Sequence, residues 1–169
     1  MKKIFLLFSV IVFALASCTR QKATIFQIGQ SRESVIKTIV NDFKVNGERL
    51  SKEDVLNKEN GNHITLYDCE YKRQYYRKVR VYYDNEKVSQ MQLKTPIDKF
   101  SDLLSQLEKE YGMPHKTSIP KYFTREDAVI FMGEKSAVIV FEEKDDDAKE
   151  YEILLVSGDK KDQLNELMK

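Results

Sequence analysis

Cysteine, glycine and proline are scarce in this chain of 169 residues, which has two cysteines, six glycines and three prolines. Two cysteines are too few for a disulfide scaffold or for a zinc module with several cysteine ligands. The low glycine and proline content excludes collagen-like and low-complexity sequences. Isoleucine, valine, tyrosine and phenylalanine are frequent instead, so the sequence predicts a folded globular protein, and its length predicts a single domain.

A charge excess of either sign is also missing. Lysine and arginine together number 28, aspartate and glutamate number 27, and the formal net charge is +1. A protein that holds nucleic acid through bulk charge carries a clear positive excess. We therefore expect no nucleic-acid partner.

The chain begins with a short basic and apolar segment. Lys2 and Lys3 precede the uncharged run from Ile4 to Leu15, whose only polar residue is Ser9. This run is shorter than the ~20 residues that span a bilayer and has the length of the apolar part of a signal peptide. The segment therefore predicts export from the cytoplasm.

The sequence Leu15-Ala16-Ser17-Cys18 that follows resembles the bacterial lipobox. The resemblance implies cleavage of signal peptide 1–17, diacylglycerol on the sulfur of Cys18 and a further acyl chain such as palmitate on its amine. More than one acyl chain gives stable anchoring. Cys69 would then be the only other cysteine, so no intrachain disulfide is expected. The alternative is a transmembrane anchor or an ordinary signal with a chance cysteine.

The remaining chain predicts an 18–24 tether and a 25–169 α+β domain, either undivided or built from two related halves, 25–95 and 96–169. Each half reads as a helix followed by three strands, and a short helix is expected over 159–169. Serines at 31 and 51 and Asp98 are the expected N-caps, and Gly112 with Pro114 is a stop signal. Short polar turns between alternating runs predict an antiparallel sheet with its helices on one face. The expected strands lie at 63–71, 79–83, 88–93, 128–132, 136–143 and 151–156.

Three short stretches resemble one family of envelope proteins. They are the helix entry Phe26-Gln27-Ile28-Gly29-Gln30-Ser31, the hairpin 81–88 and the helix exit Tyr111-Gly112-Met113-Pro114. They are similar to motifs of the SmpA/OmlA (BamE-like) lipoproteins and of the β-lactamase-inhibitor-protein-like fold. The resemblance implies a non-enzymatic, protein-binding role, although a fold alone does not establish function.

Residues that could carry catalysis or hold a metal are few. His63 and His115 lie in different halves, and Cys69 lies within an alternating strand far from an obvious base. The run Asp145-Asp146-Asp147 lacks the spacing of a calcium loop and predicts a solvated turn. We therefore expect no catalytic residues, no metal and no cofactor. An envelope hydrolase that pairs Cys69 or His63 with His115, and a carrier of a small apolar ligand, remain the alternatives.

Six tyrosines fall within residues 67–83, interleaved with lysine and arginine. In a strand, neighbouring residues face opposite ways, so one ring of each pair Tyr75/Tyr76 and Tyr82/Tyr83 should face outward. Exposed tyrosine beside arginine is typical of protein and glycan interfaces. High strand propensity of tyrosine and solubility of the outer face explain the same pattern without a partner. The predicted binding surface is Tyr71, Tyr75, Arg77, Arg80 and Tyr82.

These observations together predict a lipid-anchored interaction module of the bacterial envelope. Thr19 stands where an aspartate would retain a lipoprotein at the inner membrane, so we expect the outer membrane, facing the periplasm. The expected partners are the membrane, through the anchor, and an envelope protein or peptidoglycan.

Overall fold

The structure is a computed structural model, and it describes residues 25–96, 100–117, 128–145 and 148–157. The predicted signal peptide, the tether with Cys18, the Asp98 cap and the terminal helix 159–169 lie outside these residues. Only the first residue of the run 145–147 is described, at the end of a strand. No helix within the described ranges is long and apolar enough to cross a membrane.

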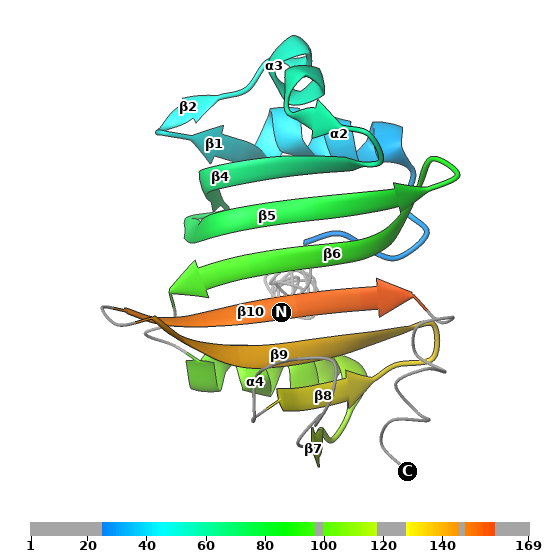
Figure 1. Cartoon of the computed structure of the whole chain (residues 1–169), viewed down its shortest axis with the longest axis vertical. Coiled ribbons are helices and arrows are strands. Elements are labelled where there is room, and N and C mark those ends of the chain that lie inside the picture. Colours follow the sequence, from blue (N-terminus) through cyan, green and yellow to red (C-terminus); the bar gives the residue numbers. More distant parts are fainter. Residues whose placement is uncertain (1–24, 97–99, 118–127, 146–147, 158–169) are drawn as a thin grey trace, which may run out of the picture.

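An open antiparallel sheet dominates the molecule (Figure 1). Nine strands follow one another in the order β2-β1-β4-β5-β6-β10-β9-β8-β7, and β3 pairs with β4 off this path. The helices that the structure describes are few, so α+β fits this fold only loosely. The strands are β1 Phe43–Val45, β2 Glu48–Arg49, β3 Glu59–Asn60, β4 His63–Tyr71, β5 Gln74–Asp84, β6 Lys87–Pro96, β7 His115–Thr117, β8 Ala128–Met132, β9 Ser136–Asp145 and β10 Ala148–Ser157.

The described helices are α2 (Arg32–Asp42), α3 (Lys52–Asn57) and α4 (Phe100–Tyr111). The signals at Ser31, Ser51 and Gly112 are confirmed. The Ser31 side chain accepts a hydrogen bond from the backbone N–H of Ser34, and Ser51 forms a capping box with Asp54. Gly112 ends α4 with φ +88°, a conformation that glycine adopts without a Cβ penalty.

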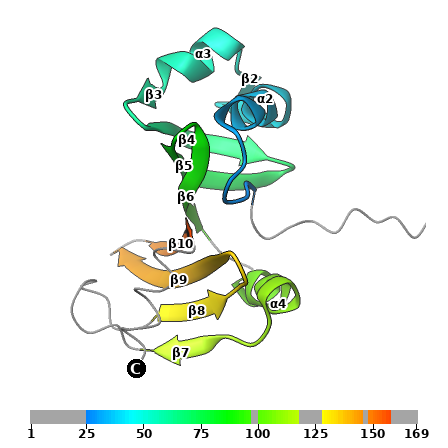
Figure 2. The same cartoon turned by 90° about the vertical axis from the view of Figure 1, so that its right-hand side faces the viewer.

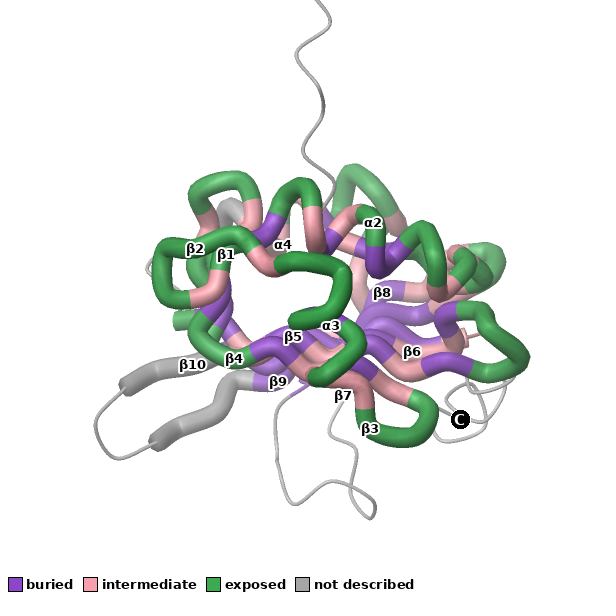
Figure 3. Tube along the Cα trace, turned by 90° about the horizontal axis from the view of Figure 1, so that it is seen from above, coloured by how far each residue is buried: buried purple, intermediate pink, exposed green. Residues whose placement is uncertain are grey.

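Helices α2 and α4 lie on the same side of the sheet, and α3 lies beside α2 (Figure 2). The side chains between these helices and the sheet form one hydrophobic core that runs through both halves of the molecule. Seen from above, the buried stretches follow the strands beneath the helices, whereas the turns are exposed (Figure 3). The large side chains of this core that are fully buried include Phe26, Ile39, Phe43, Met91, Leu93, Leu107 and Phe131.

The chain before α2 is held against the hairpin between β5 and β6. The N–H of Gly29 donates to the carbonyl of Val88 (2.8 Å), and the N–H of Arg32 donates to the carbonyl of Glu86 (2.8 Å). Gly29 has φ +83°, which a residue with a Cβ rarely adopts. This pairing fixes where α2 begins and therefore which of its faces reaches the core.

The three strands expected in each half are present, but the sheet also contains strands that were not predicted. The hairpin of β1 and β2 turns at Asn46-Gly47, with φ angles of +52° and +84°, and was not predicted. Strands β3 and β7 are also additional. The two main meanders, β4–β6 and β8–β10, join where β6 pairs with β10 from Gln90 to Pro96.

Strand β8, β9 as far as Phe141 and β10 from Tyr151 have buried side chains on both faces. Their side chains on the face away from the main core form a second cluster of buried residues: Ala128, Ile130, Ala137, Ile139, Phe141, Leu154 and Val156. This face of β8–β10 is therefore apolar, although α2 and α4 lie on the other side of the sheet. Unbroken apolar runs such as 137–141 and 153–156 are typical of strands buried on both sides.

Candidate functional site

The predicted binding residues lie around a reversal of the pleat in strands β4 and β5. In β5 the buried positions are Val79, Val81 and Tyr83 on one side of the reversal and Tyr76 on the other, so the inward parity changes between them. In β4 the same change falls at Asp68, whose φ is +47°. Because both strands reverse at the same level, their pairing register stays the same on either side.

We use the name outer face for the side of β4, β5 and β6 that points away from the core. The residues of these strands that point into the core are Ile64, Leu66, Val79, Val81, Met91 and Leu93. The residues that alternate with them point outward and form three cross-strand rows. The rows are His63–Tyr82–Gln90, Thr65–Arg80–Gln92 and Tyr67–Lys78–Lys94. Beyond the pleat reversal, Tyr75 and Arg77 are exposed and extend the same face.

Arg80 is the centre of the hydrogen bonding on the outer face. Its Nε donates to the Thr65 hydroxyl (2.8 Å), and its Nη1 donates to the Tyr82 hydroxyl (3.3 Å). The hydrogen bond with Tyr82 raises the pKa of Arg80 above its ordinary value, and Tyr67 adds to the same shift. The imidazole ring of His63 lies 5.3 Å from the Tyr82 ring. These contacts hold the aromatic rings in place beside a fixed cation.

The row of Tyr67 continues across β6 into β10. Lys78 lies opposite Lys94, and Lys94 lies opposite Glu152, with 3.9 Å between Lys94 Nζ and Glu152 Oε2. Gln92 Nε2 also donates to Glu152 (2.5 Å), which is 9% exposed. Glu152 therefore ends the polar outer face, and the second buried cluster begins at Leu154 on the same side of β10.

Four of the five predicted residues belong to the outer face, and Tyr71 does not. The Tyr71 ring lies 4.9 Å from that of Phe43, a fully buried core residue that is also its cross-strand partner. Its place on the binding surface is therefore corrected: plain alternation cannot reveal a pleat reversal. Tyr75 is 45% exposed, and its hydroxyl donates to Asp68 Oδ1 (2.5 Å).

Tyr67, which is 56% exposed, was missing from the predicted surface. The register that places it beside Lys78 depends on the turn at Lys72-Arg73, where both residues have positive φ. A turn of this type usually contains glycine, asparagine or aspartate. Because neither Lys72 nor Arg73 is of these types, the sequence carried no local signal for the register of β4 and β5.

The residues considered for catalysis are far apart in the sheet. Cys69 is fully buried, and burial raises the pKa of its thiol to about 12. His63 begins the same strand and contacts Tyr82, whereas His115 lies in β7 at the other end of the sheet. Within the described ranges no three histidine, cysteine, aspartate or glutamate side chains are grouped to hold a metal. That the protein is not an enzyme stays a prediction.

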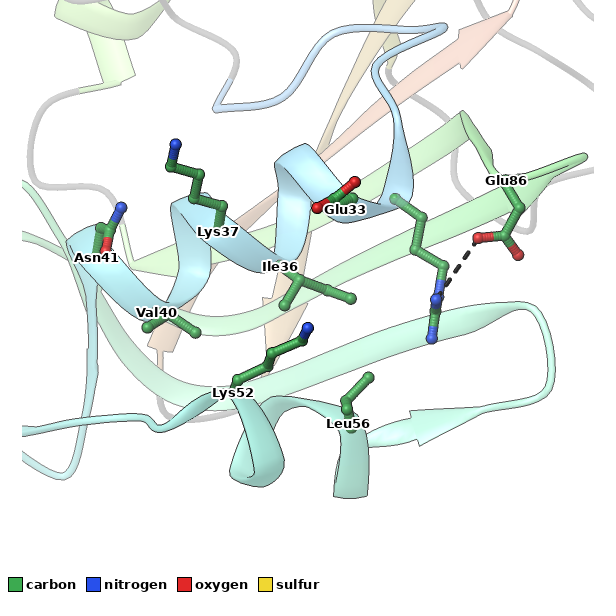
Figure 4. Close-up of a pocket in the computed structure, with 9 residues that line it drawn as sticks. Glu33, Ile36, Lys37, Val40, Asn41, Lys52, Leu56 and Glu86 are labelled. Atoms are coloured by element: carbon green, nitrogen blue, oxygen red, sulfur yellow. Dashed lines mark ion pairs between the residues drawn. The ribbon is translucent and has the colours of Figure 1, made fainter.

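A groove of about 720 Å³ lies between α2 and α3 (Figure 4). Arg32 stands at one end, where it makes a bidentate hydrogen-bonded pair with Glu59 and an ion pair with Glu86 (3.5 Å). The bond from Arg32 lowers the pKa of Glu59. The rest of the lining consists of Glu33, Ile36, Lys37, Val40, Asn41, Lys52 and Leu56.

Comparison with models of known families, with curated proteins and with solved structures gives no match for this chain.

Proposed function

We propose that this chain is a lipoprotein of the cell envelope that acts as a non-catalytic interaction module. Acyl chains on Cys18 anchor it in the outer membrane, and its domain faces the periplasm. The helix-and-meander plan of the two halves and their likeness to the BamE-like and β-lactamase-inhibitor-protein-like fold belong to the same proposal. The proposed localisation rests on the basic start, the apolar run and the four lipobox residues.

The outer face is the observation that carries the interaction. It presents the rings of Tyr67, Tyr75 and Tyr82 beside Arg80, and α2 and α4 lie on the other side of the sheet (Figure 2). Tyrosine and arginine are enriched at the centres of protein interfaces because they bury large area and bind carboxylates in fixed geometry. Side chains already held by hydrogen bonds lose little entropy on binding.

The chemistry of this face favours a protein partner that carries carboxylates. On β5 and β6 the face is lined by Arg77, Lys78, Arg80 and Lys94, whereas its acidic side chains Asp68 and Glu70 stand on β4 beside Tyr75. Flat rings beside these cations suit a surface on which apolar area alternates with aspartate or glutamate. Peptidoglycan, whose peptides also carry carboxylates, is the competing ligand.

A cross-linking pull-down from envelope membranes tests the interaction. We expect the wild type to recover a defined envelope protein and the Arg80→Ala, Tyr82→Ala variant to lose it, because both side chains leave the centre of the face. Lys109→Ala, an exposed change on α4 on the other side of the sheet, is the matched control and should recover the same protein. Equal recovery by all three chains contradicts the proposal, and recovery of murein alone favours the competing ligand.

The anchor is tested separately by growth with labelled palmitate. The wild type should take up the label and Cys18→Ser should not. Membrane attachment that persists in the unlabelled variant contradicts the lipobox interpretation but leaves the outer face untouched.

A further inference from the structure

The groove between α2 and α3 has an apolar floor that reaches solvent. Ile36 is almost fully buried at its base, Val40 is half-buried beside it, and Leu56 of α3 is 38% exposed on the opposite wall. Leu56 is one of the few large apolar side chains that the described residues leave exposed. Figure 4 shows these three side chains facing the gap between the two helices.

The lining carries three cations, Arg32, Lys37 and Lys52, and two carboxylates, Glu33 and Glu86. The guanidinium of Arg32 is already satisfied by Glu59 and Glu86. The ammonium of Lys52 points from α3 into the gap, toward Ile36 of α2 (Figure 4). No carboxylate of the described residues forms an ion pair with it. Lys37 also forms no ion pair with the described residues, but its side chain points away from α3 (Figure 4). The groove thus offers apolar surface along its length and one such cation, Lys52, that faces the gap between the helices.

The lining also limits what kind of chain can lie there. A peptide brings backbone N–H and C=O groups that need partners when they are buried. Apart from the charged side chains, Asn41 is the only polar side chain of the lining, and it lies near the end of α2, whereas Arg32 begins that helix. An alkyl chain needs no such partners, and a groove of about 720 Å³ has the size of small-molecule sites.

We propose that the groove binds a single-chain amphiphile with an acidic head, of the class of fatty acids. The alkyl chain lies along Ile36, Val40 and Leu56, and the carboxylate pairs with the ammonium of Lys52. From Arg32 to Asn41 the helix advances about 13.5 Å, which gives room for a chain of medium length. This site is separate from the outer face and does not depend on the partner proposed for it.

Photolabelling of the full chain in phosphatidylcholine vesicles tests the site, with a diazirine-bearing dodecanoic acid as the probe. Mass spectrometry should locate the label on α2 and α3, and excess dodecanoic acid should compete whereas dodecanol should not. Lys52→Glu should reduce labelling about tenfold because a charge-assisted contact becomes a repulsion. Lys52→Arg should retain it, and Lys44→Glu is the charge-matched control.

Leu56→Asn provides a second variant that keeps Lys52 and removes apolar wall, and it should also weaken labelling. Circular dichroism should show that each variant is folded like the wild type. The proposal is overturned if the label lies elsewhere, if dodecanol competes as well as the acid, or if Lys52→Glu labels like Lys44→Glu. None of these outcomes bears on the pull-down through the outer face.

Discussion

The hydroxyl of Tyr83 is buried without a hydrogen-bond partner among the described residues. Burial also raises the pKa of this phenol. Since an unsatisfied buried hydroxyl costs free energy, we expect Tyr83→Phe to keep or raise the free energy of unfolding, by up to about 1 kcal/mol. Urea denaturation measures the change.

Tyr82→Phe is the control for that variant, because its hydroxyl faces the other way and accepts a bond from Arg80. It should lower the free energy of unfolding by about 0.5–1.5 kcal/mol. A larger loss for Tyr83→Phe than for Tyr82→Phe would mean that the Tyr83 hydroxyl has a partner.

Glu59 and Arg32 tie β3 to the start of α2, and their side chains are 18% and 28% exposed. The hydrogen bond from Arg32 lowers the pKa of Glu59 in the folded state. The pair therefore adds stability above the unfolded pKa of about 4.3, and this stability is lost as pH falls through the lower folded pKa.

We expect Glu59→Gln to be about 1–2 kcal/mol less stable at pH 7 and to lose less further stability on acidification. Urea unfolding midpoints of both chains between pH 7 and pH 3 measure this difference. Parallel pH profiles for the two chains would contradict the role of the pair.

At the scale of the elements, the turn between β4 and β5 is unusual. Lys72 and Arg73 have φ angles of +49° and +69°, a region where a side chain carries a steric cost. Arg73→Gly removes that cost, so we expect the free energy of unfolding to rise by about 0.5–1 kcal/mol.

Thermal unfolding measures the effect of this substitution. Arg77→Gly, within β5 itself, should instead lower the melting temperature, because glycine weakens the interior of a strand. If Arg73→Gly and Arg77→Gly lower the melting temperature equally, the turn residues are not strained.

The same turn explains how far the sequence could predict the fold. Serine caps at 31 and 51 and the stop at Gly112 act within one turn of helix, so local residues reveal them. The pleat reversal at Asp68 depends on two strands bending together, and it decided that Tyr71 points to the core while Tyr67 does not. The hairpin at Asn46-Gly47, in contrast, carried a readable signal that was missed.

In the candidate site, too, local sequence predicts some features, whereas others arise only from packing between elements. Alternation within β5 was enough to predict that Arg80 and Tyr82 lie on one face of the strand and Val79, Val81 and Tyr83 on the other. The groove between α2 and α3 had no signal, because it arises from the packing of two helices. Lys52 in particular looks like an ordinary solvated lysine until α2 is placed beside it.

For the whole molecule, the two halves of the sheet differ on the side away from the helices. Strands β4–β6 present tyrosine, arginine, lysine and glutamine there, whereas β8–β10 bury a second apolar cluster. The rows of the outer face reach β10 at Glu152, Leu154 and Val156, so the change occurs where the halves join. Any partner that docks on the polar half therefore meets a bounded surface.

Photocrosslinking in living cells tests this account most directly. Benzoylphenylalanine would replace Tyr67 or Tyr82 on the outer face, and Met113, which is 82% exposed after α4, is the control position. The account predicts one discrete crosslinked partner from Tyr67 and Tyr82 and none from Met113. Adducts of equal yield from all three positions, or none from the two tyrosine positions, would contradict the outer face as an interaction surface.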